Sequence, residues 1–162
     1  MYDKIIRLIN IELIHIKIKL KEVITVLFEK SCGAVVIRKK DNVVETLIIQ
    51  MLGGHWSFPK GHVENNETEI ETALREIKEE TNLDVAIDTR FREITTYSPK
   101  PEVLKDVIYF IAISKSDDVI IQKSELKASK WLDIHEALGL VTYEDDKKIL
   151  KKAIKYIENN NL

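Results

Sequence analysis

Residues 61–83 read GHVENNETEIETALREIKEETNL, and this stretch decides most of what the sequence predicts. Its apolar residues recur at helical spacing, which predicts an amphipathic helix packed on a core. Thr68 is expected to cap the start of the helix, with Glu71 three residues later completing a capping box. Asn82 is expected just past the last turn in the left-handed conformation, where Asn is the usual second choice after Gly. The apolar positions are Ile70, Ala73, Leu74 and Ile77.

Three glutamates, Glu76, Glu79 and Glu80, are spaced i, i+3, i+4 on this predicted helix, so their carboxylates share one face. Like charges that close repel one another and raise one another's pKa. A cation among them would relieve the repulsion, and a ligand set made only of oxygens indicates Mg2+ or Mn2+ in preference to zinc. Arg75 is expected to hold one glutamate in place through a bidentate bond. The alternative is a solvated, Glu-rich surface helix, because most charge runs are only surface.

The spacing of these residues resembles the Nudix box, G-x5-E-x7-R-E-U-x-E-E-x-G-U, where U is aliphatic. Every fixed position matches except one, where Asn82 stands in place of the second glycine. The resemblance implies a hydrolase that cuts nucleoside diphosphates linked to another group. It also implies an α/β (α+β) fold, the Nudix α/β/α sandwich, with a mixed β-sheet between helices. The matching residues are Gly61, Glu67, Arg75, Glu76, Glu79 and Glu80.

Composition limits the class of protein further. The chain has 162 residues, which fits one domain with a sizeable core. A formal net charge of −2 does not indicate a nucleic-acid or anionic-membrane surface, so neither partner is expected. The sequence contains no run of 18 apolar residues, so no transmembrane helix is expected. The lone Cys32 cannot form an internal disulfide, which is typical of a reducing compartment, and a cytoplasmic location is expected.

The sequence divides into an N-terminal extension, residues 1–26, and a Nudix hydrolase domain, residues 27–162. Within the extension, Ile14 to Lys21 alternates strictly between apolar and polar residues, which predicts a strand with one apolar face. The extension has three open interpretations: an added strand, a dimer contact, or upstream sequence translated from a misassigned start. The oligomeric state is also left open.

The rest of the domain is predicted to alternate between strands and helices. Cys32–Arg38 and Val43–Met51 are predicted to form a hairpin around a polar turn, and Val119–Gln122 is predicted as a further strand. A long C-terminal helix is expected over Tyr143–Glu158, with Thr142 as its N-cap. Other expected elements are strands at Phe91–Tyr97, Val107–Ser114 and Lys130–Leu132, and a short helix from Ile134.

Residues outside the box indicate which nucleotide is the substrate. The string HWSFPKGHVE, His55 to Glu64, resembles the asymmetric dinucleoside polyphosphate hydrolases, which cleave diadenosine tetraphosphate to ATP and AMP. The strings KDVIYFIA, Lys105 to Ala112, and SELKASKWLDIHEAL, Ser124 to Leu138, are similar to the same group. The resemblance covers Phe28 to Leu150, and it implies a small-molecule nucleotide as the partner.

The resemblance also assigns roles to residues. It implies a site for up to three Mg2+, held by Glu76, Glu79, Glu80, Glu125 and the Lys60 carbonyl. Lys60 and His62 flank a glycine that lets backbone approach phosphate, so each is a candidate phosphate contact, although His62 could be a loop histidine without a ligand. Glu67 is a candidate base or water-orienting group whose counterpart in some relatives is mainly structural. Glu125 could instead be a surface turn residue. The expected catalytic residues are Glu79, Glu67, Arg75 and Glu125.

Adenine recognition requires a flat apolar surface on which the base can stack. The aromatic candidates are Tyr97, Tyr109 and Phe110. In the resembling family a tyrosine beyond the box stacks on adenine, and Tyr97 lies 14 residues past the box. Lys105 is a further candidate for binding the substrate. Pro99 lies close to where ADP-ribose-cleaving relatives carry a proline, so it favours a different substrate.

Two alternatives therefore remain beside the dinucleotide hydrolase. One is another Nudix activity, on ADP-ribose, a modified nucleoside triphosphate, a 5′-triphosphate RNA end or a diphosphoinositol polyphosphate. The other is a catalytically silent Nudix domain that binds nucleotides as a sensor. The intact set of glutamates argues against the silent domain, since silent members commonly lose these carboxylates.

Overall fold

The computed structural model describes residues 26–162, so the predicted strand from Ile14 to Lys21 and the other interpretations of the extension lie outside the described residues. No helix in the described range is long and apolar enough to cross a membrane. The elements are β1 Leu27–Lys40, β2 Val43–Met51, β3 Trp56–Ser57, β4 Lys60–His62, α2 Glu69–Thr81, β5 Val85–Tyr97, β6 Val103–Ser114, β7 Leu126–Asp133, α3 Ala137–Leu140 and α4 Glu144–Asn160.

The strands form one mixed sheet, as predicted. Its main path runs β3-β2-β1-β6-β5, while β4 pairs with β1 and β7 pairs with β2. The pairing of β1 with β6 is parallel, from Leu27 beside Val103 to Ile37 beside Ile113, and the other pairings are antiparallel. The predicted hairpin is confirmed, because β1 and β2 pair around a two-residue turn in which Asp41 and Asn42 have positive φ.

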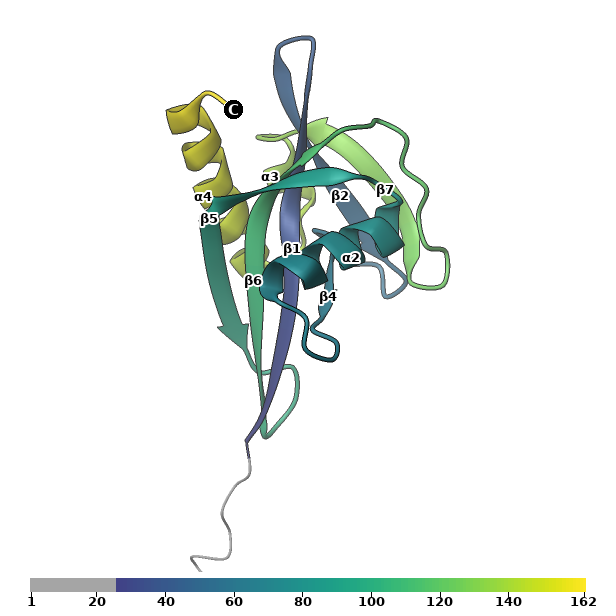
Figure 1. Cartoon of the computed structure of the whole chain (residues 1–162), viewed down its shortest axis with the longest axis vertical. Helices are drawn as coiled ribbons and strands as arrows, with labels where there is room; N and C mark the ends of the chain where they lie inside the picture. The colour runs from purple at the N-terminus through teal and green to yellow at the C-terminus, as the bar shows by residue number, and fades with distance from the viewer. Residues whose placement is uncertain (1–25) are drawn as a thin grey trace, which may run out of the picture.

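Helices cover both faces of this sheet (Figure 1). One buried cluster joins α2, through Ala73 and Ile77, to sheet residues such as Phe110. The other cluster joins α3 and α4 to the opposite face, where Tyr109 and Phe58 are buried. Neighbouring residues of a strand point to opposite faces, which is why Tyr109 and Phe110 belong to different clusters. The predicted α/β/α sandwich is confirmed.

Both ends of α2 form as the sequence predicts. The Thr68 hydroxyl accepts a hydrogen bond from the Glu71 backbone at 3.2 Å, and the Glu71 carboxylate accepts one from the Thr68 backbone at 2.8 Å. At the other end Asn82 is left-handed, with φ 58°, and its N–H donates to the Lys78 carbonyl. The helix therefore ends normally without the second glycine of the box.

The face of α2 that packs on the sheet differs from the predicted one. Ala73 and Ile77 are fully buried, but Ile70 is 37% exposed and Leu74 is 38% exposed. The prediction of a four-residue apolar stripe was therefore wrong at two positions. The helix is instead rotated so that Glu80, only 1% exposed, turns toward the sheet. The Glu80 carboxylate therefore lies on the sheet-facing side of α2, where an apolar side chain would stabilise the fold more.

The segment Val119–Gln122 is not a strand, contrary to the prediction. The backbone N–H of Ile120 donates to the Thr81 carbonyl, and that of Gln122 donates to the Glu80 carbonyl, both at 3.0 Å. The segment therefore satisfies carbonyl groups that the end of α2 leaves unpaired. As a consequence, the turn that follows it brings Glu125 close to the glutamates of α2.

The N-terminus of α4 also differs from the prediction. Tyr143, in an extended conformation, is the N-cap residue, and its side chain makes no capping hydrogen bond. The Thr142 hydroxyl instead accepts a hydrogen bond from the Trp56 backbone at 2.8 Å, while the Thr142 N–H donates to the Trp56 carbonyl at 3.0 Å. These two bonds attach the start of α4 to β3. Tyr143 and the acidic residues of the first helical turn are thereby placed beside the sheet.

Candidate active site

The glycine that opens the box lies against a carboxylate of the helix. A Cβ atom added to Gly61 would lie 2.1 Å from Oε1 of Glu76, a distance that real contacts do not reach. Gly61 is held in β4 by pairing with Cys32 of β1. The absence of a side chain at Gly61 therefore creates the space in which Glu76 packs beside the β4 backbone.

Glu80 is the most buried acid of the site. Burial raises its pKa to about 8, and the charges of Glu76 and Glu125 add to the increase. The Lys60 backbone N–H donates a hydrogen bond to the Glu80 carboxylate at 3.0 Å. The pKa of Glu76 is also raised, first by burial and further by the charges of Glu79 and Glu125. The structure thus places Glu125, from a distant turn, among the carboxylates of the box.

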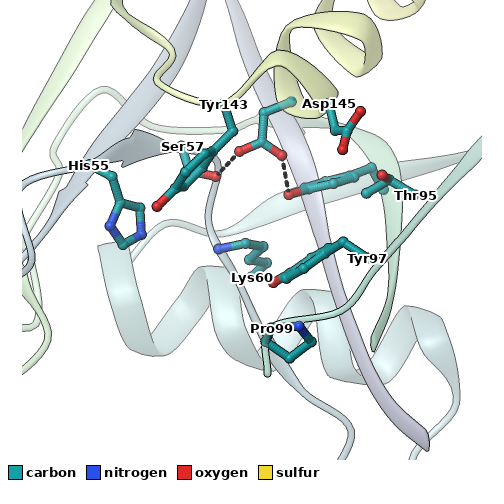
Figure 2. A pocket seen from close by; sticks show the side chains of 10 residues that line it. His55, Ser57, Lys60, Thr95, Tyr97, Pro99, Tyr143 and Asp145 are labelled. Atoms are coloured by element: carbon teal, nitrogen blue, oxygen red, sulfur yellow. Dashed lines mark hydrogen bonds between the residues drawn. The ribbon is translucent and has the colours of Figure 1, made fainter. Parts of the chain in front are cut away.

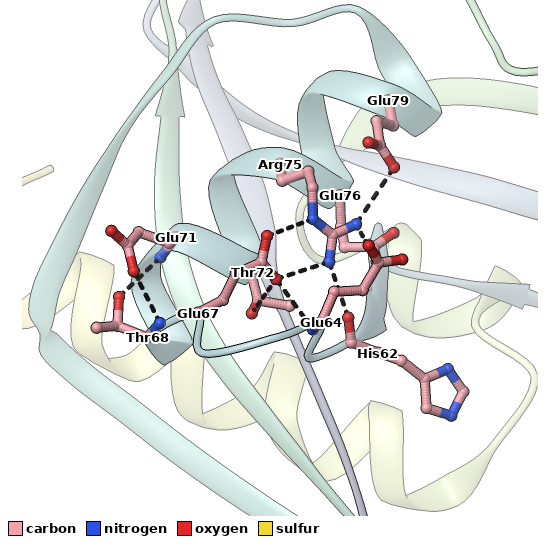
Figure 3. A network of polar contacts seen from close by, with 9 residues as sticks. All are labelled: His62, Glu64, Glu67, Thr68, Glu71, Thr72, Arg75, Glu76 and Glu79. Atoms are coloured by element: carbon pink, nitrogen blue, oxygen red, sulfur yellow. Dashed lines mark hydrogen bonds and ion pairs between the residues drawn. The ribbon is translucent and has the colours of Figure 1, made fainter.

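Arg75 lies at the centre of a polar network around these acids (Figure 3). Its guanidinium donates to both carboxylate oxygens of Glu67, at 2.6 and 2.9 Å, and to the His62 carbonyl at 2.8 Å. It also donates to Glu76 at 2.8 Å and to Glu79 at 3.3 Å. The predicted bidentate contact exists, but its partner is Glu67. Arg75 consequently ties the loop between β4 and α2 to the acidic face of the helix.

Glu67 is fully occupied by hydrogen bonds. Besides Arg75, the Thr72 hydroxyl donates to it at 2.9 Å and the Glu64 N–H donates at 3.1 Å. The bonds from Arg75 are the main reason that the pKa of Glu67 falls to about 2. A carboxylate that acidic and that well bonded is a poor proton acceptor at neutral pH. The geometry favours a positioning role for Glu67 over the role of a base.

The basic candidates gather beside β1. His62 Nε2 lies 3.2 Å from Lys105 Nζ and 3.4 Å from a carboxylate oxygen of Glu29. Burial lowers the pKa of Lys105, and the charge of Lys60 lowers it further. The sequence did not indicate a role for Glu29. Lys60 and Lys105 form a cationic group next to the carboxylates of α2, and His62 lies beside Lys105.

A cavity of about 510 Å3 opens beside this group, lined by residues from β3, β4, β5, β6 and the start of α4 (Figure 2). Lys60 stands on its wall, and Tyr97 and Tyr143 reach into it from different sides. The ring of His55 lies 5.4 Å from that of Tyr143, at an interplanar angle of 52°. The pKa of His55 is lowered, mainly by burial. The cavity therefore joins aromatic surface to the cationic edge of the site.

Only one of the three predicted aromatic candidates offers its ring to this cavity. Tyr97 is 39% exposed and lines the opening. Tyr109 also lies on the wall, but it is fully buried and packs edge-on against Phe58, so neither face of its ring is free for stacking. Phe110 is buried in the cluster under α2, on the other side of the sheet. The prediction that Tyr109 and Phe110 could stack on a base was therefore wrong.

Several residues of the cavity were not foreseen from the sequence. Tyr143 was expected only as the first residue of a helix, and Asp146 was not singled out. Asp146 is 7% exposed and accepts hydrogen bonds from the Ser57 hydroxyl at 2.8 Å and the Tyr109 hydroxyl at 2.9 Å. His55 was quoted only as part of a string. These residues reach the cavity because α4 is attached to β3, and sequence spacing does not reveal that contact.

Comparison with known proteins agrees with this arrangement. A family model for the NUDIX domain matches residues 25–153. That range contains the glutamates of α2, the loop around Gly61 and Glu125. The chain belongs to the Nudix family. It is a Nudix hydrolase, and the resemblance seen in the sequence is confirmed.

The relatives of this Nudix hydrolase include dinucleotide-cleaving enzymes. It is 36% identical over 142 residues to the asymmetrical bis(5'-nucleosyl)-tetraphosphatase of Sus scrofa, covering 79% of this chain and 95% of that protein. The same enzyme of Rattus norvegicus is 36% identical over 140 residues. Among solved structures, a binary complex of C. elegans Ap4A hydrolase has a TM-score of 0.75 at 30% identity, covering 81% of this chain and 98% of that chain.

Nudix hydrolases generally use divalent metals, and the residues of this site fit such an ion. The glutamates of α2 offer only oxygen ligands, and burial raises the pKa values of Glu76 and Glu80, with a further increase from neighbouring carboxylates. Within residues 26–162, no three His, Cys, Asp or Glu side chains already converge in ligand geometry. Arg75 occupies one carboxylate oxygen of Glu76 and one of Glu79, which leaves the second oxygen of each without a bond to Arg75.

Proposed function

We propose that this Nudix hydrolase cleaves dinucleoside tetraphosphates asymmetrically, and that its preferred substrate is diadenosine tetraphosphate, which gives ATP and AMP. The observation that carries the proposal is the 36% identity to the pig tetraphosphatase, which extends over 95% of that enzyme's length. The cavity supports it, because aromatic surface for a base lies next to cations suited to phosphates. The same observations support a small nucleotide as the partner.

The divalent ion in this proposal is Mg2+, with Mn2+ as a substitute. Its ligands would be Glu76, Glu79, Glu80, Glu125 and the Lys60 carbonyl. Such an ion supplies charge screening for the phosphates and lowers the pKa of water. The buried position of Glu80 and the contact of Glu76 with Gly61 hold two of these carboxylates in fixed places.

Glu79 is the best candidate to accept a proton from the attacking water. It is 51% exposed in its side chain, and its contact with Arg75 is long, at 3.3 Å. Glu67 is occupied by Arg75, and Glu80 is buried, so neither is as free to reach water. Arg75 acts as a positioning residue, because it holds Glu67 and the β4 loop against the helix.

The cationic group would bind the polyphosphate chain. Lys60 and Lys105 carry compact positive charges, and phosphate oxygens are strong acceptors for ammonium donors. His62 lies between Lys105 and Glu29, and its side chain is 59% exposed, so solvent and ligand can reach it. Tyr97 and Tyr143 would hold the base by stacking, an interaction worth about 1–3 kcal/mol per base.

A second candidate substrate is ADP-ribose. Pro99 lines the same cavity as Tyr97, which keeps the proline signal of the sequence relevant. The NUDIX domain of Shewanella oneidensis NrtR, solved with ADP ribose, matches with a TM-score of 0.67 but only 18% identity. That match reflects the shared fold, so ADP-ribose ranks second.

Replacement of one glutamate tests the proposed function. Glu79→Gln keeps the size of the side chain but removes its charge, so kcat for diadenosine tetraphosphate should fall by at least about 100-fold. The control is Glu158→Gln, the same change at a distant exposed position of α4, which should leave kcat unchanged. Both variants should melt within 2 °C or so of the parent, about the shift expected for less than 1 kcal/mol. Full turnover by Glu79→Gln would contradict the assignment.

A further inference from the structure

We propose that Asp146 reads the nucleobase, by accepting a hydrogen bond from an N–H donor on the edge of an amino-bearing purine. The inference rests on the proposed function only in assuming that the cavity holds the base of a nucleotide. It assigns Asp146 a role in specificity, separate from the carboxylates of α2 and from the stacking tyrosines.

The hydrogen bonds of Asp146 hold its carboxylate rigidly at the cavity. Ser57 donates to one oxygen at 2.8 Å and Tyr109 donates to the other at 2.9 Å, and dashed lines in Figure 2 mark both bonds. Ser57 comes from β3 and Tyr109 from β6, so two elements of the sheet fix the side chain. Asp146 is itself 7% exposed and lines the cavity.

Asp146 differs from the other acids in the first turn of α4. Glu144 pairs with Lys147 at 2.6 Å, and Asp145 pairs with Lys148 at 2.8 Å. The bonds to Asp146 come from neutral hydroxyls, with support from the positive end of the α4 dipole. Asp146 therefore lines the cavity with two hydroxyl donors and without the lysine partner that Glu144 and Asp145 each have. Its charge would be offset best by donors that a ligand brings.

The remaining acceptor capacity of Asp146 selects the chemistry of the ligand. An ionised carboxylate has about four lone-pair sites and no donor. Two hydroxyl bonds leave acceptor capacity on both oxygens. Adenine presents an exocyclic amino group, and guanine presents a ring N–H beside an amino group, as donors for such an acceptor. A purine without these groups would keep water away from the remaining acceptor sites of Asp146 without offering a donor in its place, which is costly.

The distribution of charge sets the orientation of the nucleotide. Asp146 repels phosphate, whereas Lys60, which lines the same cavity, attracts it. The Lys60 backbone also contacts Glu80 of the carboxylate cluster. The phosphates therefore lie toward Lys60, and the base lies toward Asp146 and the rings of Tyr97 and Tyr143.

Calorimetric binding of three mononucleotides tests the proposal without metal or turnover. The probes are AMP, GMP and purine riboside 5′-monophosphate, which lacks an amino group. The parent protein should bind AMP or GMP at least about 10-fold more tightly than the purine riboside nucleotide, the effect of one hydrogen bond to a charged group. In Asp146→Asn this preference should fall to about 3-fold or less, because the acceptor loses its charge.

Asp145→Asn is the matched control, since Asp145 is the neighbouring acid, also lines the cavity and is paired with Lys148. It should keep the preference of the parent. Equal affinity of the parent for all three nucleotides, or no measurable binding of any, would overturn the proposal even if Asp146→Asn did not fold. A full preference in Asp146→Asn would also overturn it. Tighter binding of GMP than AMP would support the role of Asp146 while counting against adenine in the proposed function.

Discussion

At the scale of single residues, the site depends on where β4 and α2 touch. Gly61 faces the Glu76 carboxylate so closely that no other residue fits without displacement. Glu76 in turn accepts a bond from Arg75, which holds Glu67 and the His62 carbonyl. Displacement at Gly61 would therefore spread to several groups of the site. Reactions that depend on such positioning are sensitive to movements of about 1 Å.

Gly61→Ala tests this dependence. The added methyl group would push Glu76 away from β4, and turnover should fall by about 100-fold. Gly139→Ala provides the control, because a Cβ at Gly139 meets no atom within 4 Å. Steady-state kinetics with diadenosine tetraphosphate would make the comparison. If Gly61→Ala turned over substrate as fast as Gly139→Ala and the parent, the close contact between Gly61 and Glu76 would not be needed for turnover.

Single residues also show how far sequence reasoning reaches. Thr68 and Asn82 were predicted correctly because caps depend on local chemistry alone. Tyr109 was not, because the apolar run around it is buried on both faces, and such a run lacks the alternation that separates exposed from buried positions. Asp146 was missed since acids are common in the first turn of any helix. Its burial depends on contacts with Ser57 and Tyr109, which are distant in sequence.

At the scale of elements, α2 combines a stable start with a functional face. The capping box between Thr68 and Glu71 closes its first turn, and the segment Val119–Gln122 covers its last carbonyls. That segment was predicted as a strand because it is apolar, but its N–H groups serve the helix end. Sequence patterns report the polarity of a segment, whereas its partner depends on the tertiary fold.

Thr68→Ala should lower the free energy of unfolding by about 1 kcal/mol, because one N-terminal N–H group loses its acceptor. The melting temperature should fall by about 3 °C for a domain of this size. Thr89→Ala, at an exposed position of β5, is the control and should change the melting temperature much less. A Thr68→Ala protein as stable as the parent would mean that the capping box contributes nothing to α2.

At the scale of the whole molecule, side-chain bonds connect the sheet to the helix behind it. Asp88 of β5 accepts hydrogen bonds from Arg90 and, at 3.1 Å, from the hydroxyl of Tyr156 in α4. The bonds from Arg90 are the main reason that the pKa of Asp88 falls to about 2. Because the folded pKa lies below the unfolded one, the stabilisation is present above about pH 4 and is lost as the pH falls toward 2.

Asp88→Asn tests this linkage through urea denaturation between pH 7 and pH 3. The variant should be about 1 kcal/mol less stable than the parent at pH 7, since Arg90 is exposed and solvent weakens the pair. The difference should shrink toward pH 3. Asp84→Asn, at an exposed ion pair with Lys78, is the control and should show little effect. A difference that stays constant from pH 7 to pH 3 would contradict the assigned cause.

The products that the whole molecule releases distinguish asymmetric cleavage of a dinucleotide from other Nudix reactions. The most direct measurement is a time course of diadenosine tetraphosphate with the full chain and Mg2+, with products separated by ion-exchange chromatography. ATP and AMP should appear in equal amounts from the first time point, and no products should form when EDTA removes the metal. Two molecules of ADP, or no cleavage while ADP-ribose gives AMP and ribose 5-phosphate, would contradict the proposed function.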